Sequence, residues 1–101
     1  MEFLEVIDLK EANFKIPGGK MVKVKLDASS GKIQKVQILG DFFLHPEETI
    51  LIIEDALSGC PKDEHSIEKI VGQTLTDSSA TLIGATASDF SKTIMMAWDA
   101  D

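Results

Sequence analysis

The stretch Val36-Gln37-Ile38-Leu39-Gly40-Asp41-Phe42-Phe43 marks the point where the hydrophobic pattern of the chain changes. Gly40 ends an apolar run, and its lack of a Cβ permits a sharp change of direction or a close approach of two backbones. Asp41 can accept hydrogen bonds from free N–H groups at such a junction. Because adjacent side chains point to opposite sides of an extended backbone, one of Phe42 and Phe43 is expected to enter the core. The other faces solvent or a partner, so the stretch predicts either a purely structural corner or a partner-binding surface.

Three strands are predicted before this junction. Apolar and polar residues alternate in 11–16, 21–27 and 32–39, as in strands with one buried face. Lys15-Ile16-Pro17-Gly18-Gly19-Lys20 supplies the first turn, because proline fixes one φ and the glycines allow positive φ. The second turn is Ala28-Ser29-Ser30-Gly31. Turns this short favour an antiparallel meander.

Two of these segments leave alternatives open. In 32–39, Gln34, Val36 and Ile38 fall on one face and Ile33 on the other, a less regular pattern that admits a bulge or a change of face. Residues 1–10 mix apolar and acidic residues and are compatible with a short strand or a loosely attached arm.

After Gly40 the apolar spacing changes to that of helices. Pro46 suits the first position of a helix that stops before Gly59. Asp63 is predicted to cap a second helix, and Thr86-Ala87-Ser88-Asp89 to form the capping box of a third. The segment 76–85 is predicted to be a connection. The residues predicted to face inward from the helices are Ile50, Ile53, Leu57, Ile67, Ile70, Val71, Leu75, Phe90, Ile94, Ala97 and Trp98.

These patterns together predict one α+β domain over residues 1–101. It comprises a three-stranded antiparallel meander followed by about three helices packed on one face of the sheet.

Charge is distributed unevenly along the chain. The net charge is −7, but residues 1–40 hold seven lysines and five acidic residues, whereas 41–101 hold three lysines and twelve acidic residues. The lysine-rich part is interpreted as a solvated face, or alternatively as a basic sheet surface that meets an acidic partner or a nucleotide phosphate. Nucleic acid is not expected as the main ligand, because the chain is acidic and has no Arg or Tyr.

The composition also bears on the compartment. No apolar run reaches the length of a membrane span, and no basic segment followed by an apolar one is seen at the N-terminus. Cys60 is the single cysteine, which excludes an internal disulfide and a CxxC pair. We therefore expect a cytoplasmic protein that does not contact membranes.

No catalytic or metal-ligating residue is predicted. His45 and His65 have no partner at ligand spacing. Cys60 lies in Gly-Cys-Pro near Lys62 and is either a reactive thiol or incidental. The Pro17–Lys20 turn contains Gly and Lys but lacks the spacing of a phosphate loop and the helix that should follow. The chain on its own is therefore not expected to be an enzyme.

Four stretches together resemble the accessory domain of lipoate–protein ligases over residues 12–98. They are 15–22, Gly31-Lys32-Ile33, Ile38-Leu39-Gly40-Asp41-Phe42-Phe43 and 82–90. Some ligases of that family join a large catalytic domain to this small domain in one chain, and others are bipartite. A chain that begins with Met and contains only the small domain is expected to be the separate subunit. The fold implied is similar to that of iron–sulfur scaffold and sulfur-acceptor proteins.

The resemblance implies an accessory subunit that forms a heterodimer with a large catalytic subunit. That complex would activate lipoate to lipoyl-adenylate with ATP and transfer it to lipoyl-domain acceptor proteins. Lipoate, ATP and Mg are implied in the complex, and no cofactor is expected on this chain alone. Lys20 is expected to neutralise phosphate charge near the reaction pocket. The residues expected to face the catalytic subunit are Lys15, Pro17, Gly18, Gly19, Lys20, Gly40, Asp41, Phe42 and Phe43.

Two other functions stay open at this point. One is a sulfur-acceptor or iron–sulfur assembly protein that acts through Cys60, and the other is a general interaction domain. Replacing Cys60 separates the first from the rest, because only that function requires the thiol.

Overall fold

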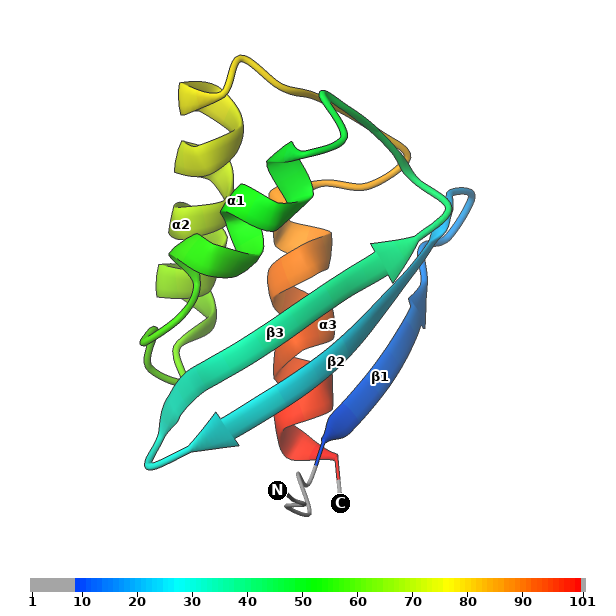
Figure 1. Cartoon of the computed structure of the whole chain (residues 1–101). Coiled ribbons are helices and arrows are strands. Elements are labelled where there is room, and N and C mark those ends of the chain that lie inside the picture. Colours follow the sequence, from blue (N-terminus) through cyan, green and yellow to red (C-terminus); the bar gives the residue numbers. More distant parts are fainter. Residues whose placement is uncertain (1–8, 101) are drawn as a thin grey trace, which may run out of the picture.

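A sheet of three strands covered on one face by three helices forms the body of the protein in the computed structural model, which describes residues 9–100 (Figure 1). This confirms the predicted α+β class; most of the predicted arm in 1–10 lies outside the described residues. The sheet strands run antiparallel in the order β1-β2-β3. The elements are β1 (Lys10–Lys15), β2 (Met21–Ser29), β3 (Lys32–Gly40), β4 (Phe43–His45), α1 (Thr49–Ala56), α2 (Glu64–Asp77), β5 (Thr81–Ile83) and α3 (Ala87–Asp99).

The core lies between the sheet and the helices. Helix α3 packs across β1 and β2, α2 packs beside α3, and α1 packs on β3. Val22, Val24 and Leu26 of the central strand are fully buried, as are Phe90 and Ile94 of α3. The strict alternation of β2 is therefore explained by a strand that is buried on one face only.

A β-bulge reconciles the irregular pattern of β3 with a single buried face. The register shifts between Asp27 and Ala28 of β2, where Gln34 of β3 has no residue opposite. The extra residue brings Ile33 to the same buried face as Val36. Of the two alternatives left open, a bulge is therefore present. The grouping of Gln34 on one face with Val36 and Ile38 is wrong, because Gln34 is exposed whereas the other two are buried.

Helix α1 begins later than the sequence predicts. Pro46 is not its first residue, because the chain is still extended in β4 up to His45, and 46–48 forms the turn into the helix. The backbone N–H of Thr49, the first helical residue, donates to the Pro46 carbonyl at 3.0 Å. Gly59, with φ of +87°, follows the helix as predicted.

The predicted caps of the other two helices are confirmed. The carboxylate of Asp63 accepts from the backbone N–H of Ser66 at 3.2 Å. Thr86 and Asp89 form a reciprocal capping box: the Asp89 N–H donates to Thr86 Oγ1 at 3.2 Å, and the Thr86 N–H donates to Asp89 Oδ2 at 2.9 Å.

A second, two-stranded sheet was not predicted. Strand β4 pairs with β5 antiparallel, in the register Phe43–Ile83, Leu44–Leu82 and His45–Thr81. The segment 76–85 is therefore not a plain connection: it holds the last residues of α2 and the whole of β5.

The first and last described elements meet at one end of the molecule. The Lys10 ammonium at the start of β1 donates to the Trp98 carbonyl near the end of α3, at 3.1 Å. The β1–β2 turn and the β4–β5 pair lie at the opposite end (Figure 1). No helix among residues 9–100 is long and apolar enough to cross a membrane.

Candidate functional site

Three segments that are distant in sequence meet at the end of the molecule opposite the contact between Lys10 and Trp98. They are the turn 15–20, the junction Gly40–Phe43 and the pair Ile83–Gly84 after β5, and we call this region the tip (Figure 1). The two predicted interface segments are therefore brought together, and the structure adds a third.

Asp41 joins the first two segments. Its Oδ1 accepts a hydrogen bond from the backbone N–H of Met21 at 2.7 Å, and its own N–H donates to the Met21 carbonyl at 3.3 Å. The hydrogen bond from Met21, helped by the charges of Lys20 and Lys15, lowers the pKa of the Asp41 carboxyl. The expectation that Asp41 satisfies a free N–H group is confirmed.

Glycine is required at Gly40 by the same contact. A Cβ at this position would collide with the Met21 carbonyl oxygen and lie 2.7 Å from the Phe42 ring. The close backbone approach that the sequence predicts is present, and it lets β2 and Asp41 lie against each other.

Gly84 joins the third segment to the turn. Its φ is +94°, and a Cβ would lie 2.6 Å from Lys20 Cγ, so the stem of Lys20 crosses the glycine directly. The Lys20 N–H donates to the Gly84 carbonyl at 3.5 Å, and Gly19 passes close to the same oxygen. Lys20 is thus held at the tip by its stem while the residue itself is exposed.

The two phenylalanines take opposite directions. Phe42 packs inward on Phe90, with ring centroids 5.0 Å apart, whereas Phe43 is 55% exposed. Of the two, only Phe43 presents its ring to solvent, and Phe42 supports the tip from within.

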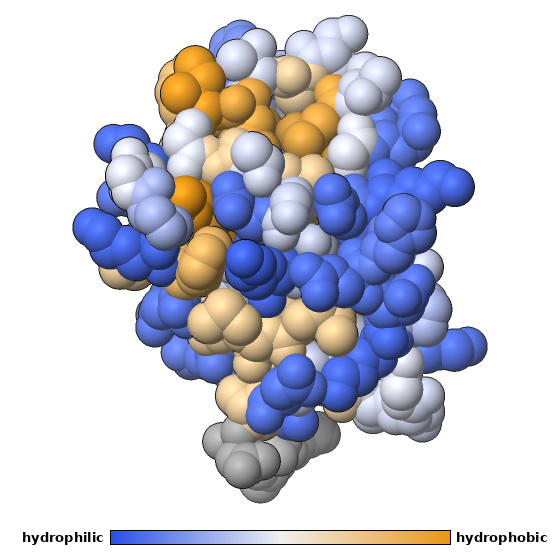
Figure 2. All heavy atoms as spheres, turned by 180° about the vertical axis from the view of Figure 1, so that it is seen from behind, coloured by the Kyte–Doolittle hydropathy of each residue, from blue (hydrophilic) through white to orange (hydrophobic). Residues whose placement is uncertain are grey.

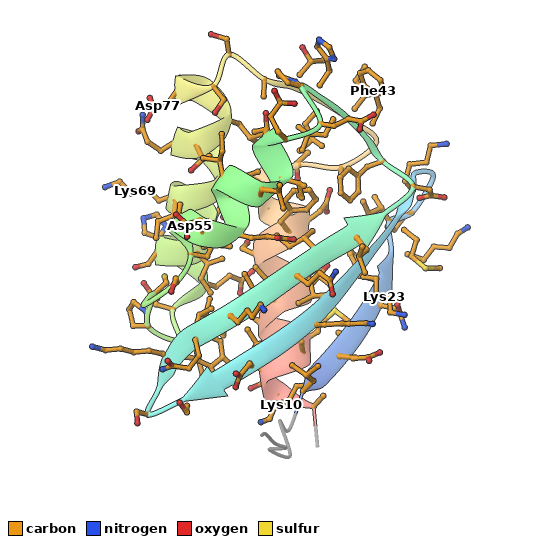
Figure 3. All side chains as sticks on the ribbon, viewed as in Figure 1. Lys10, Lys23, Phe43, Asp55, Lys69 and Asp77 are labelled. Carbon is orange, nitrogen blue, oxygen red and sulfur yellow. The ribbon has the colours of Figure 1, made fainter. Side chains whose placement is uncertain are left out.

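Phe43 has an apolar neighbour that the sequence did not identify. Ile83 lies directly opposite it in the β4–β5 register and is 59% exposed. The ring of His45 stacks on Phe43, with centroids 6.4 Å apart and planes 9° apart. The outward face of this small sheet is therefore an aromatic and aliphatic surface, which Figure 3 shows projecting from the end of the molecule at Phe43.

A groove runs beside this pair. It has a volume of about 340 Å³ and is lined by the end of β3, by 42–45 and by the start of α1, with Leu39, Phe43 and Ile50 among its apolar side chains. In the space-filling view from behind, strongly hydrophobic atoms also gather at the tip end of the molecule (Figure 2). Exposed apolar surface of this kind is typical of sites that contact another protein, a membrane or a ligand.

The remaining predicted interface residues surround this surface. Lys15 ends β1 and is exposed opposite Met21, and Pro17 and Gly18 form the exposed corner of the turn, with φ of +71° at Gly18. The Gly19 N–H closes the turn on the Ile16 carbonyl at 2.8 Å.

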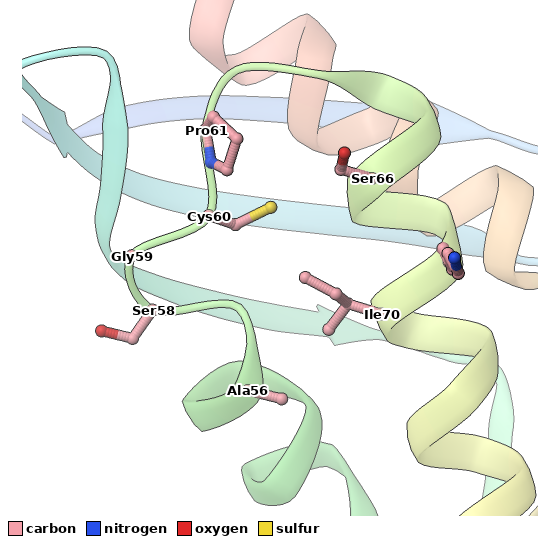
Figure 4. Close-up of a pocket in the computed structure, with 8 residues that line it drawn as sticks. Ala56, Ser58, Gly59, Cys60, Pro61, Ser66 and Ile70 are labelled. Atoms are coloured by element: carbon pink, nitrogen blue, oxygen red, sulfur yellow. The ribbon is translucent and has the colours of Figure 1, made fainter.

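Cys60 lies in a different part of the molecule, in the loop between α1 and α2 (Figure 4). It lines a hollow of about 420 Å³ with Ser66 and Ile70 of α2, but only 4% of the residue is exposed. Burial, and secondarily the charge of Asp63, raises the pKa of its thiol. The thiol is therefore protonated at neutral pH and is a poor nucleophile.

The histidines do not assemble a metal site. His45 is exposed in β4 and His65 is exposed in the first turn of α2. Within residues 9–100, no three His, Cys, Asp or Glu side chains are grouped so that they could hold a metal ion.

Comparison with known proteins identifies the family of the chain. The family model described as the C-terminus of bacterial lipoate protein ligase matches residues 9–94, which is most of the chain. The chain belongs to this family.

Similar proteins include a ligase subunit and a chain in a solved bipartite ligase. Over 58 residues this chain is 41% identical to lipoate-protein ligase A subunit 2 of Thermoplasma acidophilum, a match that spans 57% of this chain and 55% of that protein. A solved structure of a bipartite lipoate protein ligase and its E2 lipoyl domain from the same organism contains a similar chain. The TM-score is 0.72 at 27% identity, covering 85% of this chain and 93% of that one.

Proposed function

We propose that this ligase C-terminal domain is the accessory subunit of a bipartite lipoate–protein ligase. In this proposal it binds a large catalytic subunit and is needed with it for ATP-dependent activation of lipoate to lipoyl-adenylate, and hence for protein lipoylation, in the cytoplasm. The observation that carries the proposal is the exposed Phe43–Ile83 pair at the tip of a domain of this family. The similarity of this chain to a ligase subunit and to a chain in the solved structure of a bipartite ligase supports the proposal.

The tip is suited to cover a reaction pocket on another protein. Its apolar pair would exclude water when covered, and Lys20 would bring a positive charge to the same edge, held in place by its crossing of Gly84. A reactive acyl-adenylate is protected from hydrolysis when a partner closes the pocket and orders its loops. We propose that the sites for lipoate, ATP and Mg belong to the catalytic subunit.

The surroundings of Cys60 disfavour the sulfur-acceptor alternative. A persulfide carrier needs an accessible thiolate, whereas this thiol is buried and its pKa is raised. No cluster of metal-binding side chains is found within residues 9–100 that would help a single cysteine to hold an iron–sulfur cluster.

The first experiment mixes the full chain with a catalytic lipoate-ligase subunit from the same source. We expect a complex by size-exclusion chromatography, and lipoyl-adenylate from lipoate and ATP in the mixture but from neither protein alone. Full activation by the large subunit alone, with no complex formed, would overturn the proposal.

Variants then locate the interface. Phe43→Ser and Ile83→Ser are expected to abolish the complex while the chain stays folded, since both side chains are more than half exposed. Met96→Ser is the matched control, because Met96 is also an exposed apolar residue, 40% accessible, but lies in the later part of α3, toward the end that meets Lys10. Equal loss in all three variants would contradict an interface at the tip.

A further inference from the structure

The face of the three-stranded sheet that points away from the helices carries a group of lysines. Since Val22 and Val24 are fully buried, their neighbours Lys23 and Lys25 point to the opposite side, and Lys23 extends away from the helices in Figure 3. Lys15 and Lys35 lie on the same side of β1 and β3, and Met21 and Leu39 add apolar surface between them. We call these six residues the basic face.

The register places these side chains next to one another. Lys15 lies opposite Met21, and Lys23 lies opposite Leu39. Neighbouring strands are about 4.8 Å apart, so each lysine stem lies beside a non-lysine side chain of the adjacent strand while its ammonium group can reach solvent. Two acidic residues, Glu11 opposite Lys25 and Asp27 opposite Lys35, interrupt the face but leave it positive.

The basic face is exceptional on this molecule. Residues 9–40, which form the sheet, contain seven lysines and two acidic residues, whereas 41–100, which form the helices and the β4–β5 pair, contain three lysines and eleven acidic residues. The two layers of the protein thus carry opposite charge. An approaching acidic protein would be attracted to the sheet and repelled by the helices, which sets the orientation of the encounter.

The chemistry of the basic face differs from that of the tip. The Phe43–Ile83 pair is apolar, as in interfaces that persist. Lysines around the small apolar centre of Met21 and Leu39 instead favour rapid, salt-dependent association, which suits a partner that arrives and leaves in every catalytic cycle. In the proposed enzyme that partner is the protein that accepts the lipoyl group. Nucleic acid fits less well, because no aromatic side chain is among the six residues of the face and two carboxylates interrupt it.

We propose that the basic face is a second docking surface, which binds an acidic surface of the acceptor domain during lipoyl transfer. This inference rests on the proposed function and extends it from the catalytic partner to the acceptor. The basic face and the tip adjoin at Lys15 and Met21, so both proteins are engaged at once by different faces of the same small domain.

The test measures lipoyl transfer by the assembled complex to the apo acceptor domain from the same source. Lys25→Glu is compared with Lys69→Glu, an exposed residue of α2, so that both variants change the net charge equally. We expect Lys25→Glu to lower kcat/KM for the acceptor about tenfold at low salt through a higher KM, and about twofold at high salt. Lys25→Gln should give a smaller loss, and Lys69→Glu none.

Two control measurements make the outcome decisive. Complex formation and lipoyl-adenylate synthesis are followed in the same variants and are expected to match those of the unmodified protein. If they match but KM for the acceptor does not change, the basic face is not the docking surface, although the proposed function stands. If the variants lose the catalytic subunit, the basic face belongs to that interface and the inference is wrong.

Two further outcomes would overturn the inference that the basic face binds the acceptor domain. Salt-sensitive binding of a DNA duplex that is lost in Lys25→Glu, with no change in acceptor kinetics, would assign the face to nucleic acid. Absence of complex and activation with the unmodified chain would overturn both the proposed function and this inference.

Discussion

Asp41 and Met21 are 20 residues apart in sequence, yet the Asp41 carboxylate accepts the Met21 backbone N–H at 2.7 Å. This hydrogen bond holds the first residue of β2 against the end of β3, at the point where the turn before β2 and the junction after β3 meet. Replacing Asp41 with Ala should leave the Met21 amide without this acceptor. We expect faster hydrogen exchange at Met21 in Asp41→Ala than in the unmodified chain, and little change at Val24 in the middle of the strand.

The same carboxyl makes stability depend on pH. Its pKa is lowered in the folded chain, so the unfolded chain binds the proton more readily, and stability is lost as pH falls below the ordinary value of 3.8. Asp41→Asn should flatten the decrease of Tm with falling pH in this range without abolishing it. Asp63 also has a lowered pKa, owing to hydrogen bonds from Ser66, and keeps contributing. A decrease of unchanged steepness in Asp41→Asn would contradict the assignment.

Gly40 is expected to be intolerant of any side chain. A Cβ would collide with the Met21 carbonyl oxygen, so Gly40→Ala should lower the free energy of unfolding by about 1–3 kcal/mol, as overpacked sites do. Gly72 offers a matched control within α2, since a Cβ there meets only the Ala87 Cβ at 4.0 Å. Gly72→Ala should raise stability by about 0.5–1 kcal/mol, because alanine favours a helix more than glycine. Denaturant unfolding of both variants measures the contrast.

Phe42 and Phe43 should respond oppositely to the same replacement. Phe42 packs on Phe90, so Phe42→Ala is expected to destabilise the chain by about 2 kcal/mol, less than a fully buried phenylalanine would. Phe43→Ala removes an exposed ring and should change stability by no more than about 0.5 kcal/mol while weakening the complex with the catalytic subunit. Loss of stability in both variants, or in neither, would show that the two directions are misassigned.

Cys60 is expected to be dispensable for activity. Cys60→Ala should retain lipoate activation by the mixed subunits, because the thiol lies in the α1–α2 loop and not at the tip. In the unmodified chain a thiol reagent should react slowly at neutral pH and faster once denaturant exposes the residue, since burial raises the pKa of the thiol. Loss of activity in Cys60→Ala would revive the sulfur-acceptor function.

Much of the fold was predictable, because one-sided burial and helix caps leave local signatures. The alternation in 21–27 identifies β2 because the central strand has one fully buried face, and the Thr86–Asp89 spacing identifies the start of α3. The resemblance of Gly40-Asp41-Phe42-Phe43 to the ligase domain agrees with the family match over residues 9–94.

The parts that were missed depend on pairing between distant segments. Strands β4 and β5 have three residues each, too few to show a period, and their partners are about 40 residues apart. Without that pairing Pro46 looked like the start of a helix, Ile83 had no assigned role, and the direction of Phe43 stayed open. The apolar triplet Thr81-Leu82-Ile83 before Gly84 was the one available signal, because a short apolar run bounded by glycine is compatible with a buried strand.

The contact between the Lys20 side chain and Gly84 joins residues that are far apart in sequence, and such contacts bear on the order of folding. The contacts that build the tip close chain segments of 20, 40 and 64 residues, namely Met21–Asp41, Phe43–Ile83 and Lys20–Gly84. Closing such segments costs conformational entropy that only the packed core offsets, so we expect the tip to form late in folding. A chain whose helices have not yet docked has no assembled Phe43–Ile83 surface. Assembly with a partner at the tip would thereby select finished molecules and leave incomplete ones unbound.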